Sequence, residues 1–317
     1  MEILIAVFLF LLGLVFIVKG GDYFVDAASW IAEVSGIPKF IVGATIVSIA
    51  TTLPEVIVSM IAAFGGQVDM AIGNAVGSVT ANTGLIMAIS ILFIPAALDR
   101  KKMGFKCILM IAAAAVLYIF SLKNSALSYI GSAILLVIFA VFIFENIRSA
   151  KGEADEKVEI TGGKKEVTFN IIKFVVGAAG IVIGAQLLVN NATVLAKALG
   201  ISETIISVTI VAIGTSLPEL VTTITTIAKK QSSLSIGNIV GANIIDMAII
   251  LPICSLIAGK PLPISAQGIM YDMPVCLMII SLAMIPALLR KKFSRVQGAL
   301  MILCYIAYIV LIVAIPK

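Results

Sequence analysis

Long apolar segments, separated by short polar loops, follow one another along almost the whole chain. A run of about 18 or more apolar residues is long enough to cross a bilayer as a helix. Ten such segments fit the pattern best, near residues 3–19, 37–63, 69–97, 103–121, 126–147, 168–190, 202–228, 233–258, 267–289 and 295–315. The pattern therefore predicts an all-α integral membrane protein with ten transmembrane helices.

The composition excludes most soluble classes of protein. The 317 residues are 61% hydrophobic and only 12% charged, whereas soluble domains carry about 25% charged residues. Histidine is absent, and the four cysteines lack the spacing of a metal site. The chain has no phosphate-binding loop and no nucleophile–base pair, so we expect neither an enzyme nor a cofactor. The first segment begins Met1-Glu2 without a basic region, which favours a retained span over a cleaved signal peptide.

The basic residues are divided unequally between the two sides of the predicted membrane. If the N-terminus lies outside, the outer loops hold only Lys123, Lys197, Lys260 and Lys317 of the 22 lysines and arginines. Loops that face the cytoplasm collect lysine and arginine. The sequence therefore predicts a cell-membrane protein with both termini outside, and the net charge of +5 reflects orientation rather than nucleic-acid binding.

The two halves of the chain are repeats at a constant offset of 164 residues. Leu53-Pro54-Glu55 recurs as Leu217-Pro218-Glu219, and Ile72-Gly73-Asn74 recurs as Ile236-Gly237-Asn238. Each half holds five predicted spans, and because five is odd the second half enters the membrane from the opposite side. Such inverted-topology repeats are typical of secondary transporters.

These boundaries divide the chain into three parts. Residues 1–147 form the first five-helix repeat, and residues 168–317 form the second, inverted five-helix repeat. Residues 148–167 between them contain the only sustained polar stretch, which predicts a flexible cytoplasmic linker.

Three carboxylates, those of Glu55, Glu219 and Asp246, fall deep inside predicted spans. A charge near the bilayer centre costs at least about 2.5–3.5 kcal/mol, so an intramembrane carboxylate indicates a functional site. No basic residue falls in the middle of any span and could neutralise them. We therefore expect the carboxylates to bind mobile cations.

A proline directly precedes two of these carboxylates and breaks each helix. Pro54 and Pro218 displace backbone carbonyls about four residues earlier. Further hydroxyl oxygens beside the breaks come from Thr51, Thr52, Thr215 and Ser216. Backbone carbonyl oxygens half a turn further back come from Ser48 and Ala212. An environment made only of oxygen ligands suits hard cations such as Ca²⁺.

The span after each broken helix repeats the same arrangement. Glycines four residues apart in Gly73–Gly77 and Gly237–Gly241 predict close approach of helix backbones. A polar residue follows each pair of glycines, Asn82 in the first repeat and Asp246 in the second. Asn82 lies four residues after Ser78 and Asp246 lies four residues after Ala242, so each shares a helix face with that residue. Close packing alone would not require a polar residue at both positions.

The doubled motifs Thr-Ser-Leu-Pro-Glu and Gly-Asn-x-x-Gly-x-x-x-x-(Asn/Asp) resemble the α-repeats of the calcium/cation antiporter superfamily, most closely its prokaryotic sodium/calcium exchangers. The resemblance covers both halves of the chain. It implies two inverted five-helix repeats with broken second and seventh helices around cation sites at the membrane midplane. It also implies calcium export driven by sodium entry through alternating access, by a protein that works as a monomer.

The same resemblance implies roles for individual residues. Glu55 and Glu219 are the main calcium ligands and are shared with sodium sites. The hydroxyls of Thr51, Thr52, Thr215, Ser216 and Ser78, with the carbonyls of Ser48 and Ala212, complete the sites, and Asn82 and Asp246 face the central position. The first repeat has Ala50-Thr51-Thr52 where the family pattern is Gly-Thr-Ser, which keeps the hydroxyls. Ala242 stands where the family has serine, so one sodium site lacks a ligand.

This departure leaves alternatives open. A proton-coupled calcium exchanger of the same fold would use a carboxylate, with Asp246 as the candidate, that binds a proton and calcium in turn. A carboxylate at position 246 is also compatible with a potassium requirement. A cation channel would use the same glutamates as a filter, but channels usually place such residues in rings around a pore axis.

Overall fold

The computed structural model describes residues 2–66, 68–95, 97–153, 164–199, 214 and 216–314. Within these ranges, eight helices are long and apolar enough to cross a membrane. A further span is a pair of helices, Lys39–Thr51 and Leu53–Phe64, bent by 45° at the break between them. The chain is therefore a helical integral membrane protein, and the second predicted span is broken where its proline lies.

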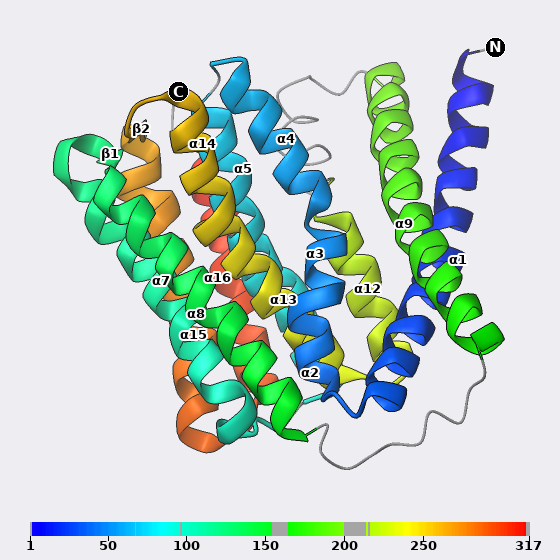
Figure 1. Ribbon diagram of the computed structural model, residues 1–317. Coiled ribbons are helices and arrows are strands. Elements are labelled where there is room, and N and C mark those ends of the chain that lie inside the picture. Colours follow the sequence, from blue (N-terminus) through cyan, green and yellow to red (C-terminus); the bar gives the residue numbers. More distant parts are fainter. Residues whose placement is uncertain are drawn as a thin grey trace.

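The helices follow one another with short connections (Figure 1). They are α1 (Glu2–Ser35), α2 (Lys39–Val42), α3 (Ser48–Thr51), α4 (Leu53–Phe64), α5 (Val68–Ala81), α6 (Ala88–Phe93), α7 (Phe105–Leu122), α8 (Tyr129–Glu153), α9 (Lys164–Ala198), α12 (Leu217–Ala228), α13 (Ser232–Ile245), α14 (Leu251–Ala258), α15 (Met273–Arg290) and α16 (Arg295–Ala314). Wider π-helical turns continue several of them: η1 (Gly43–Val47), η2 (Asn82–Met87), η3 (Arg100–Gly104), η6 (Asp246–Ile250) and η7 (Gly268–Asp272). A 3₁₀ turn, η4 (Lys123–Ser125), leads into the strand β1 (Ala126–Leu127), which pairs antiparallel with β2 (Leu262–Pro263).

The long helices α1 and α9 lie side by side along one edge of the molecule (Figure 1). Glycines from both helices meet in their interface. A Cβ atom on Gly20 would lie 2.9 Å from the carbonyl oxygen of Gly177, and one on Gly177 would lie 2.8 Å from that of Gly20. Because backbone contacts backbone here, α1 and α9 form one closely packed pair.

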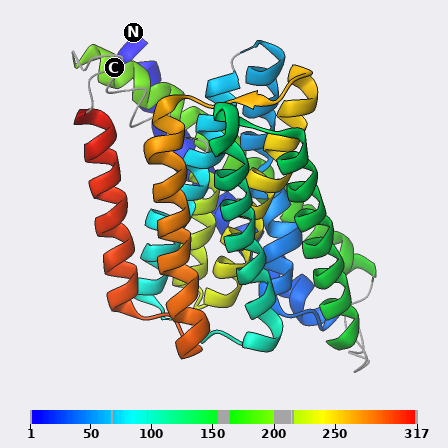
Figure 2. The same cartoon turned by 90° about the vertical axis from the view of Figure 1, so that its left-hand side faces the viewer.

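The other helices surround α13, which is buried from Leu234 to Ile245. Helices α7, α15 and α16 stand next to one another on the side away from α1 (Figure 2). The second span packs on α13 through Gly237 and Gly241, where a Cβ atom would collide with the Phe40 carbonyl or the Ser48 hydroxyl. The predicted close approach is thus confirmed for these two glycines. Gly73 and Gly77 have no described atom within 4 Å of an added Cβ. Residues 204–212, the repeat equivalents of the segment that packs on Gly237 and Gly241, lie outside the described residues, so the prediction stays open for this pair.

Some predicted boundaries were wrong. The first span was predicted to end near residue 19, but α1 remains helical to Ser35 because Phe24, Val25 and Ala28 bury an apolar face beyond Lys19. The predicted flexible linker is helical at both ends, since α8 continues to Glu153 and α9 begins at Lys164. The predicted span 202–228 is described only over α12 and Gly214, and most of its first half lies outside the described residues.

Candidate functional site

The residues that directly precede helices α4 and α12 have similar backbone angles. Thr52, which precedes α4, has φ −84° and ψ −3°, and its repeat equivalent Ser216, which precedes α12, has φ −86° and ψ 7°. The proline after each of these residues lies in the first turn, where its missing N–H leaves no hydrogen bond unmade. Each glutamate therefore lies in the first turn of its helix, Glu55 in α4 and Glu219 in α12.

Asp246 joins these two glutamates in the interior. It begins the π-helical turn η6 at the end of α13. All three side chains are fully buried. Glu55 is close enough to both Glu219 and Asp246 for their charges to interact. The structure thus gathers the three predicted carboxylates into one cluster.

Hydroxyl and amide groups connect the broken helices across the repeats. The Thr51 hydroxyl donates a hydrogen bond to Oδ1 of Asn238 over 3.1 Å. The Thr52 hydroxyl donates to Oε1 of Glu219 over 3.4 Å. Two of the predicted ligand hydroxyls therefore belong to the same buried network as the carboxylates.

Many of the buried polar atoms in this region accept or donate no hydrogen bond. They are both carboxylate oxygens of Glu55 and of Asp246, Oε2 of Glu219, the hydroxyl of Ser216 and both amide atoms of Asn82. In the described ranges, Lys39 pairs with Glu33, Lys173 pairs with Asp26, and Lys229 pairs with both Asp22 and Asp26. None of these ion pairs includes one of the three buried carboxylates. Buried polar atoms are rarely left without a partner unless a water, an ion or a ligand meets them.

The carboxylates alone do not make a metal site. Among the described residues, no group of three His, Cys, Asp or Glu side chains is arranged to hold a metal ion. Hydroxyl, amide and carbonyl oxygens would have to complete the coordination of a cation. The unpartnered oxygens beside the carboxylates have the chemistry that such a ligand set requires.

The remaining predicted ligands fall into two groups. Ser78 is buried in α5, and Ser48 is buried at the start of α3. The Ser48 carbonyl accepts hydrogen bonds from the Thr52 N–H at 2.9 Å and from the Thr51 hydroxyl at 3.4 Å. Thr215 and Ala212 lie outside the described residues.

Sequence reasoning missed three buried or half-buried asparagines that brace the site. Nδ2 of Asn74 donates to the Ser59 hydroxyl at 2.9 Å and to the Glu55 carbonyl at 3.3 Å, which ties α5 to α4. Asn238 accepts from Thr51, as described above, and Asn243 donates to the Thr83 hydroxyl at 2.8 Å. The repeated Gly-Asn motif contained the signal for Asn74 and Asn238, but its glycines alone were interpreted.

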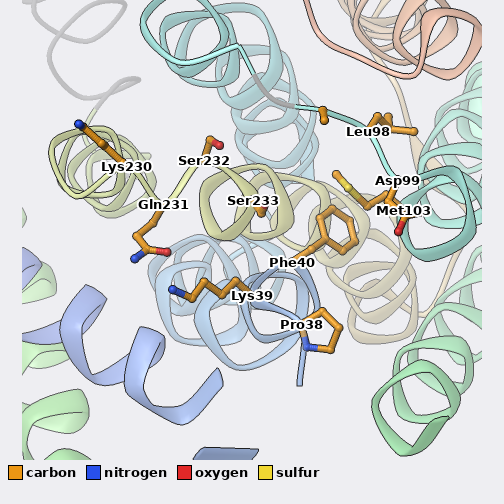
Figure 3. A pocket seen from close by; sticks show the side chains of 11 residues that line it. Pro38, Lys39, Phe40, Leu98, Asp99, Met103, Lys230, Gln231, Ser232 and Ser233 are labelled. Atoms are coloured by element: carbon orange, nitrogen blue, oxygen red, sulfur yellow. The ribbon is translucent and has the colours of Figure 1, made fainter. Parts of the chain in front are cut away.

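A cavity of about 270 Å³ leads toward the two helix breaks. Pro54, Pro218, Val58, Ala185 and Gln186 are among the residues that line it. A separate cavity of about 550 Å³ lies near the start of α2 and the connection from α12 to α13 (Figure 3). None of the three deep carboxylates lines either cavity, but the first one is lined by Pro54 and Pro218, the residues directly before Glu55 and Glu219.

Comparisons with known proteins agree with this geometry. Residues 5–147 and 169–314 match the family described as sodium/calcium exchanger protein. The chain is 30% identical over 345 residues to the sodium/calcium exchanger MaX1 of Methanosarcina acetivorans, covering 95% of this chain and 97% of that one. It is 31% identical over 299 residues to an uncharacterized membrane protein of Methanocaldococcus jannaschii, covering 94% of each.

Solved structures of the sodium-calcium exchanger NCX_Mj have the same fold. The structure soaked with zero Na⁺ and Ca²⁺ superimposes with a TM-score of 0.84 at 29% identity, covering 98% of this chain and 99% of that one. The structure soaked with 2.5 mM Na⁺ and 10 mM Sr²⁺ gives a TM-score of 0.83. The chain therefore belongs to the sodium/calcium exchanger family of the calcium/cation antiporter superfamily, and it is of the prokaryotic type.

Proposed function

We propose that this protein exchanges calcium for sodium across the cell membrane by alternating access around Glu55, Glu219 and Asp246. The observation that supports the proposal is the cluster of three fully buried carboxyl groups, in which five of the six oxygens have no hydrogen-bond partner and no described basic residue pairs with them. A permanent negative cluster at this depth is costly. In a cation exchanger, either bound cation neutralises the cluster, before the exchange and after it.

The proposed architecture is a ten-helix bundle made of two inverted repeats, residues 1–147 and 168–317, with a cytoplasmic linker at 148–167 and both termini outside. The equal backbone angles at Thr52 and Ser216 support an equivalent break in the seventh helix. In this arrangement α4 extends from the site toward the outside and α12 extends toward the cytoplasm.

In the proposed site, Glu55 and Glu219 bind Ca²⁺ directly, and Asp246 and Asn82 face the central position. Hydroxyls of Thr51, Thr52, Ser78, Thr215 and Ser216 and the carbonyls of Ser48 and Ala212 supply further ligands. The half-helix N-termini place partial positive charge near the two glutamates. Sodium ions and calcium compete for the same carboxylates, so the site carries only one kind of cargo at a time, and this competition couples the two fluxes.

A second candidate is a proton-coupled calcium exchanger of the same fold. Ala242 is fully buried in α13 and has no side-chain oxygen at the position equivalent to Ser78. The site therefore offers sodium one ligand fewer on that side, while Asp246 offers a carboxylate that can bind a proton. The same carboxylate could hold a potassium ion, so potassium is included in the test.

The decisive experiment is radioactive calcium uptake into proteoliposomes. Uptake is compared under an outward sodium gradient, an acid-inside proton gradient and no gradient, with and without potassium. Sodium-driven uptake is the expected result. Uptake driven only by protons would replace sodium by protons as the coupling ion, and uptake in neither case would refute calcium exchange.

A further inference from the structure

A cluster of charged side chains joins α1 to the end of α12. Nζ of Lys229 lies 2.8 Å from Oδ1 of Asp26 and 3.3 Å from Oδ1 of Asp22. The same ammonium group donates a hydrogen bond to the Asp22 backbone carbonyl at 2.9 Å. Lys173 of α9 approaches Asp26 from the other side, at 4.0 Å. We refer to Asp22, Asp26 and Lys229 as the latch.

The other repeat lacks every charge of the latch. At the offset of 164 residues, Asp22 corresponds to Gln186, Asp26 to Asn190, and Lys229 to Gly65. The repeats are otherwise alike nearby, since Gly13 and Gly20 of α1 correspond to Gly177 and Gly184 of α9. The helix-packing glycines are thus present in both repeats, whereas the charges occur only at the end of the molecule that the proposed topology places in the cytoplasm.

The packing differs between the two ends in the same way. On the latch side, Gly21 of α1 presses against α12: an added Cβ would lie 2.7 Å from the Thr225 hydroxyl and 3.0 Å from Val221. Its equivalent Ala185 lines the 270 Å³ cavity between α9 and the broken helices.

The two α12 residues that contact Gly21 have equivalents in α4, and these line a cavity. Ile57 and Ile61, which correspond to Val221 and Thr225, line an adjoining apolar cavity of about 570 Å³. The α1–α9 pair is therefore closed against α12 at one end and stands away from α4 at the other.

We propose that the latch holds the α1–α9 pair against α12 and biases the transporter toward the state that is closed to the cytoplasm and open to the outside. The inference rests on the proposed alternating-access function. Because the repeats are inverted, the opposite state has α1 standing away from α12 as α9 now stands away from α4. The latch contacts exist in only one of the two states, and an interaction made in one state alone shifts the equilibrium toward it.

The size of the bias follows from the exposure of the latch. The side chains of Lys229, Asp22 and Asp26 are 25%, 45% and 50% exposed. Ion pairs with this much solvent contact are weak, so removing the latch should change the ratio of the two states by at most about fivefold. Such a change alters the preferred side of opening and leaves the binding site intact.

The test measures how accessible the 270 Å³ cavity beside α9 is to a reagent added outside. An Asn190→Cys substitution places a thiol at an exposed position that lines that cavity, and its rate of modification by a membrane-impermeant maleimide added outside reports the outward-open fraction. Protein without this substitution gives the background rate, since Cys107, Cys254 and Cys276 are buried and Cys304 is partly buried. Labelling is done in proteoliposomes at one fixed ion composition.

Two kinds of variant change the latch in a way that the repeat itself suggests. Asp22→Gln, Asp26→Asn and Lys229→Gly together copy the outer end onto the latch end, and Lys229→Gln alone is a milder form. Lys230→Gln is the matched control, because it removes the same charge from the next residue, which lines the cavity of Figure 3 instead. Lys229→Arg keeps the charge and should keep the latch.

We expect both latch variants to slow maleimide labelling, by up to about fivefold, and both Lys230→Gln and Lys229→Arg to label at the parent rate. Equal labelling of the parent and of Lys229→Gln, in protein that still exchanges calcium for sodium, would overturn the latch. Failure of the parent protein in the flux assay would instead refute the proposed function. The two failures are therefore distinguishable.

Discussion

Replacing Glu55 with glutamine should separate two effects of its buried carboxylate, the proposed binding of calcium and the cost of burial. Glutamine has nearly the same size, so packing is preserved. The substitution removes one of three carboxyl groups that lie together without a basic partner in the described part of the chain. Like charges repel more strongly in a buried site than in water. We therefore expect the ion-free Glu55→Gln protein to be at least as stable as the parent.

The calcium-bound state should respond in the opposite way. At a calcium concentration about 100 times the Kd, binding stabilises the parent by about 2.7 kcal/mol. Removing one member of a buried charge interaction costs about 3–5 kcal/mol, which weakens binding by about 100-fold or more. At the same calcium concentration, the stabilisation of the variant then falls to about 0.4 kcal/mol or less.

Thermal unfolding in detergent, with and without calcium, measures both effects on one sample. Asp69→Asn is the matched control, because Asp69 is an exposed acid on the neighbouring helix α5. The control should keep the full calcium-dependent shift. A Glu55→Gln protein that retained the parent's shift, or that transported calcium at the parent's rate, would show that Glu55 is not a calcium ligand.

Two further substitutions test the ligand set and the packing. Ala242→Ser restores a hydroxyl at the buried position equivalent to Ser78. We expect the variant to reach half-maximal calcium uptake at a lower sodium concentration than the parent. An unchanged sodium dependence would contradict a ligand role at this position. Gly237→Ala places a methyl group against the Phe40 carbonyl and should lower the unfolding free energy by about 1–3 kcal/mol. Gly104→Ala is the control, because its added methyl group would make only ordinary contacts, at 3.5 Å from Leu288 and 3.7 Å from Arg100, and it should have little effect on thermal unfolding.

The sequence predicted the helices and the buried carboxylates well, because both depend on local pattern. Apolar length located the spans that the described residues contain, and the proline before Glu55 located the bend. The end of α1 was wrong for a specific reason. Asp22 and Asp26 look like loop residues in a local window, yet they lie in a helix because Phe24, Val25 and Ala28 beside them are buried by tertiary packing that a local window does not show.

The local sequence pattern also does not predict which side chains contact each other between the two repeats. The Thr51 hydroxyl was expected to face a cation, and the structure shows that it also donates to Asn238. Which of several buried oxygens a hydroxyl contacts depends on the register of two helices packed through glycine. That register is a property of the tertiary fold, although the repeated Gly-Asn motif marks the residue involved.

The proposed inverted repeat would also provide an internal comparison between the two states of the transporter. If the halves were identical in sequence, the states open to the outside and to the cytoplasm would have equal energy, and neither face would be preferred. Directionality must therefore come from positions where the repeats differ. Ala242 against Ser78 and Asp246 against Asn82 differ at the site, so they should decide which ions bind. The latch differs far from the site, at the contact between α1 and α12. Substitutions in the first group should change ion dependence from both sides of the membrane, and substitutions in the second should change the side of opening at constant ion dependence.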